Sequence, residues 1–551
     1  MIACPNCGGN LKFDPATQKM RCAFCDSEFS PEEVQEEHEA QAQEAVPQEP
    51  REELPPEETY SAFVFTCPQC GGELISYDDT AATFCSFCGA SNILESRLSD
   101  QQKPKMVIPF ALSKEACEAA YRKKISASLF APDSFKEDSN VENFRGIYMP
   151  YWVYNLHADH PIEMKGKTEQ RKGDYIYTRH YKLRGNLRAH YDGISYDASS
   201  SFSDALSSAI APFDIKGAVP FQSNYLSGFY ADTADVSSQV YLQESRGAME
   251  EDLKSAIRKT SAFRKYTIPD SDVRRASEAD SVSSERAMFP VWFLSTRVGD
   301  RISYAVVNGQ TGKVAADIPV SYMKYLIGSL IIAVPVFLAL TFNTFIRPSI
   351  ITTIAMGVAL VSLIISNSQL NRIAARENRL DDKGYTSTLT PSELKALKEN
   401  NGVTIKSKPQ RSAGDTVKAG VTSASVTLTI IGVIFLLVMP IIGIALLVAA
   451  SMVRKEEGKD KTLVKTGKEK IKVKASASQK MKVLWKPLCG ILIALSVLSI
   501  NPVSDLYYWA GALVSMFFVG WSFWDVVQEH NMLSTRKLPQ FNRRGGDESE
   551  H

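Results

Sequence analysis

Five long apolar runs occupy the C-terminal part of the chain and predict helices that cross a membrane. Each has roughly the 17 to 25 residues that a helix needs to span a hydrocarbon core of about 30 Å. Only Arg347 and Pro348 separate the first two runs, and residues 501–505 separate the last two, so each pair predicts a tight hairpin. The runs cover residues 326–346, 349–365, 426–453, 484–500 and 506–524.

The middle run leaves two alternatives open. Pro440 divides it into two halves that are each too short to span alone, so it is either one kinked span or a re-entrant segment. The flanking loops 367–425 and 454–483 are basic, and the positive-inside rule places both in the cytoplasm. Only a re-entrant segment satisfies the rule for both loops, whereas a kinked span is the commoner structure.

Alternating apolar and polar positions between residues 103 and 320 predict a soluble β-rich α+β domain. Residues 175–191 alternate throughout, with tyrosines and leucines on one face and Thr, His, Lys and Arg on the other. Two segments, "GIYMPYWVY" at 146–154 and "RAMFPVWFL" at 286–294, share an aromatic-Pro-aromatic pattern that favours a distant internal repeat. The predicted helices are 113–129, with Ser113 as its N-cap, and 234–258.

Charge separates the N-terminal part of the chain from the rest. The 551 residues include 62 basic and 62 acidic side chains, but residues 31–59 hold eleven glutamates and one arginine. This composition cannot bury enough apolar surface to fold and predicts a disordered linker over 31–61. The first residues offer no basic region followed by an apolar stretch, so we expect no cleaved signal peptide and a cytoplasmic N-terminus.

Eight of the ten cysteines lie in the first 88 residues, as four C-x-x-C pairs. The pairs are separated by 14 residues in both copies, which indicates an internal duplication. Without a secretion signal, this pattern favours metal binding over a disulfide scaffold. Zinc prefers four thiolates in a tetrahedron, and each C-x-x-C turn supplies two of them. The predicted ligands of two structural Zn²⁺ ions are Cys4, Cys7, Cys22 and Cys25 within residues 1–30, and Cys67, Cys70, Cys85 and Cys88 within residues 62–97.

Other chemistries for these cysteines are a rubredoxin-like iron site, a thioredoxin-like dithiol and a disulfide. A redox dithiol would leave the second pair of each set unexplained. Gly8, Gly71 and Gly89 follow C-x-x-C pairs where the turn needs a residue that tolerates positive φ, and Asp26 takes the fourth such position. A closed four-cysteine site has no open coordination position, so it supports folding rather than catalysis.

These eight positions resemble the zinc-ribbon superfamily known from transcription factor IIB and from ribosomal and polymerase subunits. Nucleic-acid binding would be the first inference from that resemblance. The ribbons, however, carry at least as many acids as bases, and each zinc centre with four thiolates adds about two negative charges. Phosphate would be repelled, so protein contact is the expected role and nucleic acid is not an expected partner.

The wider chain is similar to a bacterial group of membrane-bound double-zinc-ribbon proteins that are often encoded beside phage-shock and SPFH proteins. The similarity rests on the ribbon pair, on "YMPYW" at 148–152, on "FPVWF" at 289–293 and on "NGQTGKV" at 308–314, and covers roughly residues 1–345. It implies that cytosolic or membrane-associated proteins are recruited to the bilayer during membrane or envelope stress. It implies no known reaction.

Patterns that would indicate an enzyme or a transporter are missing. "NGQTGK" lacks the first glycine of a phosphate-binding loop and the Ser or Thr after Lys313, and it predicts a hairpin turn at Asn308 and Gly309. The central parts of the apolar runs lack the Asp, Glu, Lys and Arg that ion-coupled transport needs. We therefore expect neither catalysis nor a small-molecule substrate.

The middle domain contains four histidines, His157, His160, His180 and His190, without the carboxylate spacing of a metalloenzyme. His180 and His190 share a polar strand face with basic residues. Two alternatives stay open for that face: it is solvated, or it binds an acidic partner or the acidic linker. The basic residues are Lys182, Arg184 and Arg188.

Together these patterns predict a multidomain protein of the cell membrane, with two small β zinc ribbons, a β-rich α+β domain and a C-terminal α-helical membrane region. The expected function is that of a multi-pass, membrane-anchored adaptor whose N-terminal domains face the cytoplasm and whose basic stretch 459–486 contacts anionic lipid headgroups. The alternative is a membrane-tethered protein that binds nucleic acid or the transcription apparatus. The predicted units are 1–30, 31–61, 62–97, 103–320, 326–366, 367–425, 426–453, 454–483, 484–524 and 525–551.

Overall fold

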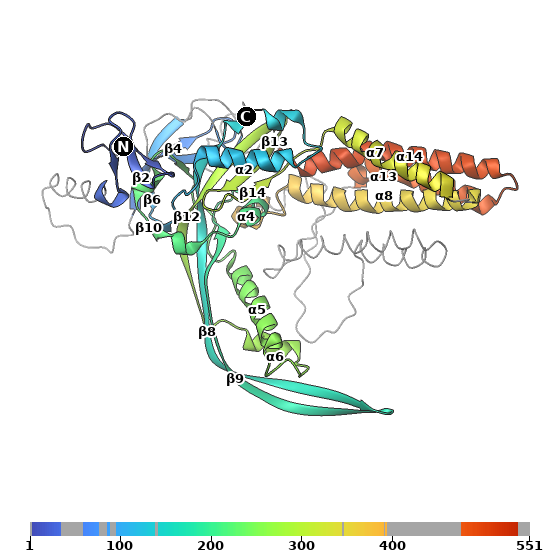
Figure 1. Ribbon diagram of the computed structural model, residues 1–551, viewed down its shortest axis with the longest axis horizontal. Helices are drawn as coiled ribbons and strands as arrows, with labels where there is room; N and C mark the ends of the chain where they lie inside the picture. Colours follow the sequence, from blue (N-terminus) through green and yellow to red (C-terminus); the bar gives the residue numbers. More distant parts are fainter. Residues whose placement is uncertain are drawn as a thin grey trace.

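The computed structural model has a body built on one large β-sheet, a long β-hairpin arm and a bundle of apolar helices (Figure 1). The bundle extends from one end of the body along the long axis, and the arm projects across that axis. The expected division into cysteine-rich β regions, a β-rich domain and C-terminal helices is therefore present. The structure describes residues 3–34, 59–76, 85–88, 95–137, 141–343, 347–390, 392–393, 475 and 477–537.

The first ribbon forms its own antiparallel sheet of three strands, and all other described strands join a sheet of twelve. The small sheet contains β1 (Leu11–Asp14), β2 (Lys19–Cys22) and β3 (Glu28–Phe29). The large sheet contains β4 (Thr59–Thr66), β5 (Glu73–Ser76), β6 (Glu95–Gln102), β7 (Met106–Val107), β8 (Arg145–Lys172), β9 (Tyr175–Asp197), β10 (Val219–Pro220), β11 (Tyr230–Ala231), β12 (Ser281–Val298), β13 (Arg301–Asn308), β14 (Val314–Ala316) and β15 (Arg536–Lys537).

The strands of the second ribbon continue the large sheet. The order along its main path is β10-β7-β12-β8-β11-β5-β4-β6, so β5 reaches the centre of the body through β11. β11 pairs antiparallel with β5 and parallel with β8. The segment expected as a separate ribbon at 62–97 thus shares one sheet with the domain expected at 103–320.

The two aromatic-Pro-aromatic segments pair with each other at the centre of the sheet. β8 and β12 run antiparallel, with Met149 opposite Phe289 and Ile147 opposite Val291. Both faces of this pair are buried, because Met149 and Phe289 belong to one core while Tyr148 belongs to the other. Burial on both faces explains why these segments read as continuous apolar runs instead of alternating.

The body helices only partly follow the expected ranges. α2 (Lys114–Ser126) confirms the first predicted helix, and the Ser113 hydroxyl caps it by accepting from the Ala116 amide. The second predicted helix begins later, as α5 (Leu242–Lys259), because the preceding residues bond to the sheet instead: the Trp152 indole donates to the Val236 carbonyl at 2.7 Å. The remaining short helices are α4 (Asp204–Ile210), α6 (Asp270–Ala276), η1 (Asp133–Lys136), η2 (Ile215–Gly217) and η3 (Ser223–Leu226).

The apolar runs that the structure describes are helical. α8 (Pro348–Glu377), α13 (Ala477–Ile500) and α14 (Asp505–Leu533) contain three candidate spans that are long and apolar enough to cross a bilayer. α7 (Tyr322–Asn343) contains a shorter apolar stretch among its described residues. α8 continues beyond 366, so the first part of the basic segment expected as a loop is helical. The run at 426–453 and most of the basic stretch 459–486 lie outside the described residues.

Charged side chains join the body to the bundle. Arg301 of β13 pairs with Glu377 at the end of α8, and Arg376 lies 2.7 Å from Asp317 of the body. Arg536, which follows α14, approaches Asp317 at 3.6 Å. These five side chains are at most 22% exposed, so solvent screens the contacts weakly. The bundle is thereby held to the body by more than the chain connections.

A second part of this junction involves Asp382, which caps α9 (Lys383–Thr388). Its carboxylate accepts from the Tyr385 amide at 2.9 Å and lies 3.1 Å from Arg379. Burial raises the pKa of Asp382 to about 7 against the opposing effect of Arg379, and the charge of Asp204 raises it further. The folded protein therefore tends to hold a proton at this site.

We expect the Asp382→Asn variant to flatten the dependence of stability on pH. Because the folded pKa of about 7 exceeds the ordinary 3.8, the favourable contribution of Asp382 is complete below about pH 4 and lost as the pH rises through about 7. Asparagine keeps the cap but cannot ionise. Thermal unfolding in detergent at pH 5 and pH 7.5 should show a larger gain in stability for Asp382→Asn at pH 7.5 than at pH 5. The exposed neighbour gives the control, Asp381→Asn, and equal shifts for both variants would contradict this explanation.

Candidate metal centres

The structure brings the eight predicted ligands together as two groups of four. The sulfur atoms of Cys4, Cys7, Cys22 and Cys25 form the first group, and those of Cys67, Cys70, Cys85 and Cys88 form the second. Within each group the sulfurs lie within 4.8 Å of one another. Each group could hold a metal ion, as the repeated spacing predicts.

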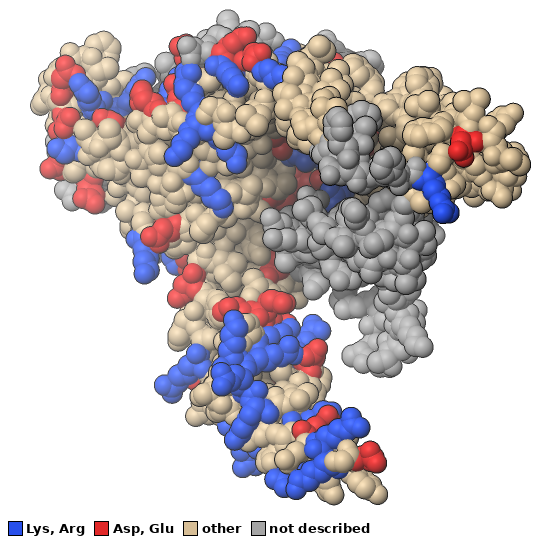
Figure 2. All heavy atoms as spheres, turned by 45° about the vertical axis from the view of Figure 1, so that its right-hand side comes forward, with Lys and Arg blue, Asp and Glu red and all other residues tan. Residues whose placement is uncertain are grey.

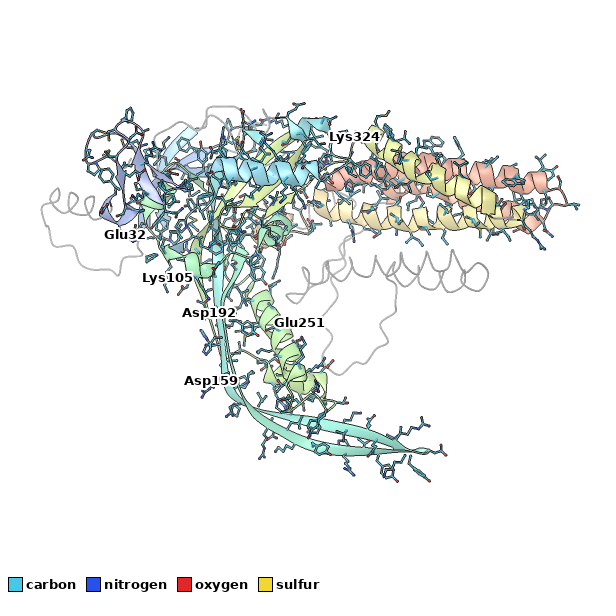
Figure 3. All side chains as sticks on the ribbon, in the orientation of Figure 1. Glu32, Lys105, Asp159, Asp192, Glu251 and Lys324 are labelled. Carbon is cyan, nitrogen blue, oxygen red and sulfur yellow. The ribbon has the colours of Figure 1, made fainter. Side chains whose placement is uncertain are left out.

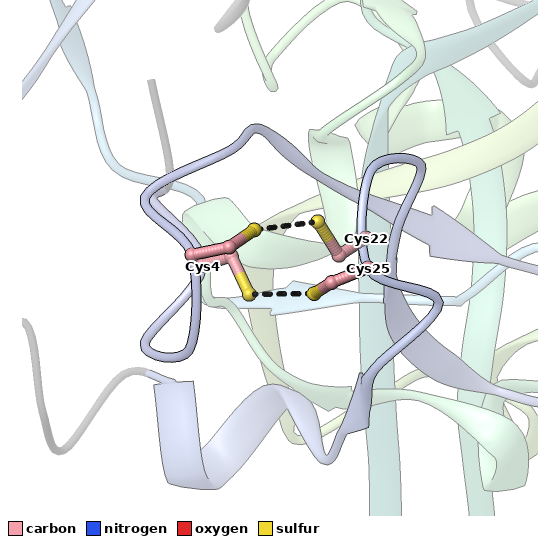
Figure 4. Close-up of side chains that lie close together, drawn as sticks. Cys4, Cys22 and Cys25 are labelled. Atoms are coloured by element: carbon pink, nitrogen blue, oxygen red, sulfur yellow. Dashed lines mark hydrogen bonds between the residues drawn. The ribbon is translucent and has the colours of Figure 1, made fainter.

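The sulfur separations fit a tetrahedral metal site. In the first ribbon Cys4 and Cys25 lie 3.7 Å apart and Cys7 and Cys22 lie 3.5 Å apart (Figure 4). The corresponding pairs of the second ribbon are both 3.7 Å apart. A tetrahedron with Zn–S bonds of about 2.3 Å has edges of about 3.8 Å. A disulfide would require about 2.05 Å, so these separations favour a metal over a disulfide.

The close packing of the four thiols in the second group also favours a bound cation between them. Hydrogen bonding to Cys67 raises the pKa of Cys70 and Cys85 above the ordinary thiol value, and burial raises both further. Several thiolates cannot be ionised side by side in this space without a positive charge between them. A divalent metal ion would supply that charge. The site is compatible with zinc, which binds thiolates.

The turns that hold the ligands have the expected backbone. Gly8 and Gly71 have φ values of 72° and 69°, and Asp26 has a φ of 53° at the equivalent position. The amides of Gly8 and Gly71 donate to the carbonyls of Cys4 and Cys67, at 2.8 and 2.7 Å, and close the same tight turn in both copies. The prediction of positive φ is confirmed at these three positions, and Gly89 lies outside the described residues.

The first ribbon packs on the body as an added unit. The Phe13 amide donates to the Ser227 carbonyl at 3.1 Å, and the Ser227 hydroxyl donates back to the Leu11 carbonyl at 2.5 Å. The rings of Phe13 and Tyr225 meet edge to face, 5.3 Å apart. Cys4 and Cys22 are buried in the same core as Phe13, whereas Cys7 and Cys25 are exposed. One side of the first centre therefore faces solvent.

The second centre is part of the interior of the body. All four of its cysteines are buried and pack with sheet residues such as Phe289 and Phe293. Arg297 of β12 donates to the Cys88 carbonyl at 3.2 Å, and the Tyr304 hydroxyl donates to the Phe87 carbonyl at 2.7 Å. The contacts of β1 with the body hold the first group in place, and the large sheet surrounds the second. The two groups differ in burial, because all four cysteines of the second are buried but only two of the first.

The two centres lie on opposite faces of the central strands. The core that contains Cys4 and Cys22 includes Tyr148, which points to one face of β8. The core that contains the second group includes Met149, which points to the other face. Successive residues of a strand point to opposite sides, so the sheet separates the two centres.

The histidines of the middle domain do not build a further metal group among the described residues. His157 and His190 face each other across the β8–β9 pair, with their Nδ1 atoms 2.7 Å apart. His160 instead bonds to Asp280 at 2.9 Å. The candidate metal groups found in the described part of the chain consist of cysteines.

Sequence reasoning missed a charged pair inside the bundle. Lys486 of α13 lies 2.7 Å from Asp525 of α14, and their side chains are 12% and 13% exposed. Lys486 also lies over the ring of Trp521, at 5.2 Å. The sequence places Lys486 at the end of the basic stretch 459–486 and inside the apolar run 484–500, and the structure places it well inside α13, which begins at Ala477. Its partner, 39 residues later, gave no sequence signal.

Comparisons with known proteins give a relative without an assigned activity. The chain is 29% identical over 333 residues to the uncharacterized protein YdjG of Bacillus subtilis (strain 168), an alignment that spans 58% of this chain and 90% of YdjG. No family model matches the chain, and no solved structure matches it.

Proposed function

We propose that this protein is a membrane-anchored adaptor that presents a zinc-bound ribbon to cytosolic partners, in the response to membrane or envelope stress. In this proposal each cysteine group holds one Zn²⁺ ion, and the apolar helices cross the cell membrane with the body in the cytoplasm. The closed four-cysteine geometry leaves no ligand position for a substrate, which supports a binding role rather than an enzymatic one.

The observation that carries the proposal is the position of the first ribbon. It lies at the end of the body opposite to the helices, and therefore at the greatest distance from the bilayer in an anchored protein (Figure 1). Phe24, between Cys22 and Cys25, is 80% exposed. A large apolar side chain at the tip of a rigid metal-bound turn is well suited to fill a pocket of a partner protein.

Hydrogen bonds near the helix ends support an arrangement in which the whole body lies on one side of the bilayer. The Ala475 amide donates to Asn371 of α8 at 3.0 Å, and Asn531 of α14 exchanges two hydrogen bonds with Val320 of the body. The start of α13 and the ends of α8 and α14 thus lie at the body side of the bundle. One side of the bilayer then holds the whole body.

A photo-crosslinking amino acid at position 24 tests the adaptor role directly. The matched control carries the same amino acid at Leu129, which is 77% exposed on the body. We expect protein adducts from position 24 whose yield changes at least severalfold when the membrane potential is collapsed, and no such change at 129. Adducts to nucleic acid, or equal yields at both positions under both conditions, would contradict the proposal.

A further inference from the structure

The β8–β9 arm is a two-stranded ribbon that leaves the body and ends in solvent. β8 pairs with β12 as far as His157. Beyond this point, close to Asp159 in Figure 3, the ribbon continues as the β8–β9 pair. The first part of the ribbon packs against α5 and α6 through Ile162, Met164 and Leu183. Residues 169–182, which follow, are exposed on both faces.

The tip of the arm is apolar. Tyr175, Ile176 and Tyr177 are 74%, 65% and 57% exposed, and they follow directly on the turn at Gly173, where φ is 62°. A ribbon of two strands with no covered face gains little stability in water. Three adjacent large apolar side chains at its end therefore indicate a surface that is covered in the working protein.

The sides of the arm are basic. Residues 164–183 contain six Lys or Arg against Glu169 and Asp174, and Glu169 already pairs with Lys167 at 2.6 Å. Figure 2 shows Lys and Arg gathered over the arm. A second copy of the arm would bring the same charge, so pairing between two arms is disfavoured. The six basic residues are Lys165, Lys167, Arg171, Lys172, Arg179 and Lys182.

The course of the arm brings the tip toward the side of the molecule where the helices lie. The ribbon first crosses the long axis and then curves beyond α6, so that its tip points in the same direction as the far end of the bundle (Figure 1). At about 3.3 Å per residue, the strand from Ala158 to Lys172 extends roughly 50 Å. The arm is therefore long enough to reach a bilayer that surrounds the bundle.

We propose that the arm is a second membrane contact, with Tyr175, Ile176 and Tyr177 in the interface of the same bilayer and the six basic side chains on anionic phospholipid headgroups. Tyrosine suits this depth because its ring is apolar and its hydroxyl stays hydrated. The tip stays at headgroup level, because the free edge of β9 carries backbone groups that need partners which hydrocarbon does not offer. This inference rests on the membrane anchoring proposed above.

Lipid quenching in nanodiscs tests the contact with the full-length, metal-loaded chain. A polarity-sensitive dye is attached at Ile176→Cys in a Cys489→Ser background, and the matched control places it at Asn186→Cys, an exposed position nearer the body. Discs contain phosphatidylcholine with brominated acyl chains, with or without about one third phosphatidylglycerol. We expect quenching at position 176 to exceed that at 186 at least threefold in the anionic discs, and to fall at least twofold without the anionic lipid.

Charge neutralisation separates headgroup binding from simple proximity. Replacing the six basic residues by glutamine leaves Ile162, Met164 and Leu183 in place, and should reduce quenching at position 176 in anionic discs to the level in neutral discs. The control changes lysines of the body, Lys123→Gln, Lys124→Gln and Lys136→Gln, and should leave the quenching unchanged.

The other possible outcomes would contradict either the membrane anchoring or the contact between the arm and the bilayer. Failure of the chain to enter discs would overturn the anchoring itself. Entry into discs with equal quenching at 176 and 186 would overturn the arm contact and leave the anchoring intact. A dye that is shielded but unquenched in neutral discs would show that protein covers the tip. A response to added duplex DNA, without one to phosphatidylglycerol, would assign the arm to nucleic acid.

Discussion

The Cys67→Ser/Cys70→Ser variant is expected to lose one metal ion per chain and, with it, the folded body. A structural zinc site contributes on the order of 10 kcal/mol, which is comparable to the whole stability of a typical domain. The second centre is buried in the core that includes Phe289 and Phe293, so its loss opens that core. Metal analysis should find half the wild-type content, and limited proteolysis should cut within the large sheet.

The first ribbon provides the comparison for that experiment. Cys4→Ser/Cys7→Ser should also halve the metal content, but the β8–β12 pair keeps its core on the other face and the body should stay resistant to protease. Cys117→Ser, a buried thiol outside both groups, should change neither quantity. If the variant at Cys67 and Cys70 resisted protease as well as the wild type, the second centre would not support the body.

The Lys486→Met variant is expected to lower the stability of the bundle by about 3 kcal/mol or more, because Asp525 would keep a buried charge without a partner. For a bundle of this size, at about 4–8 °C per kcal/mol, such a loss corresponds to a fall in unfolding temperature of more than about 10 °C. The fall is measured as loss of the monodisperse peak after heating in detergent. Lys482→Met changes an exposed lysine of the same helix and should have little effect.

A paired replacement distinguishes the ion pair from other roles of Lys486. Lys486→Met combined with Asp525→Leu removes both charges, so most of the lost stability should return. No recovery in the double variant would indicate that Lys486 acts mainly through another contact, such as the one with Trp521.

The two groups of four cysteines were predictable because the turns that form them are local. Each C-x-x-C turn forms within four residues, and its repetition at the same spacing pointed to all eight ligands before any fold was known. Ser113 as a helix cap and the turn at Asn308 were predictable for the same reason: the Asn308 side chain accepts from the amides of Gln310 and Thr311, two and three residues away. The fold class followed from runs and alternation that need no distant partner.

Features that depend on distant partners were not predictable. Nothing in "CPQC" shows that β5 pairs with β11, because its partners Tyr230 and Ala231 lie about 150 positions later in the chain. The late start of α5 depends on Trp152, and the pairing of Lys486 with Asp525 depends on how two helices pack. The alternation at 175–191 predicted a strand correctly, but it does not show how deeply one face is buried along the strand: Leu183 is buried, whereas Tyr175 and Tyr177 are exposed.

β15 makes the body depend on residues that are synthesised after the helices α13 and α14. Arg536 and Lys537 pair with Ile302 and Arg301 of β13, and the guanidinium of Arg536 donates to the Ser203 hydroxyl at 2.9 Å. These residues leave the ribosome only after α13 and α14 have been made. Until then β13 has an open edge next to an incomplete charge network, which proteases and chaperones can recognise. In the membrane arrangement proposed above, a chain whose last helical hairpin fails to insert would therefore expose a recognition site for proteases on its body.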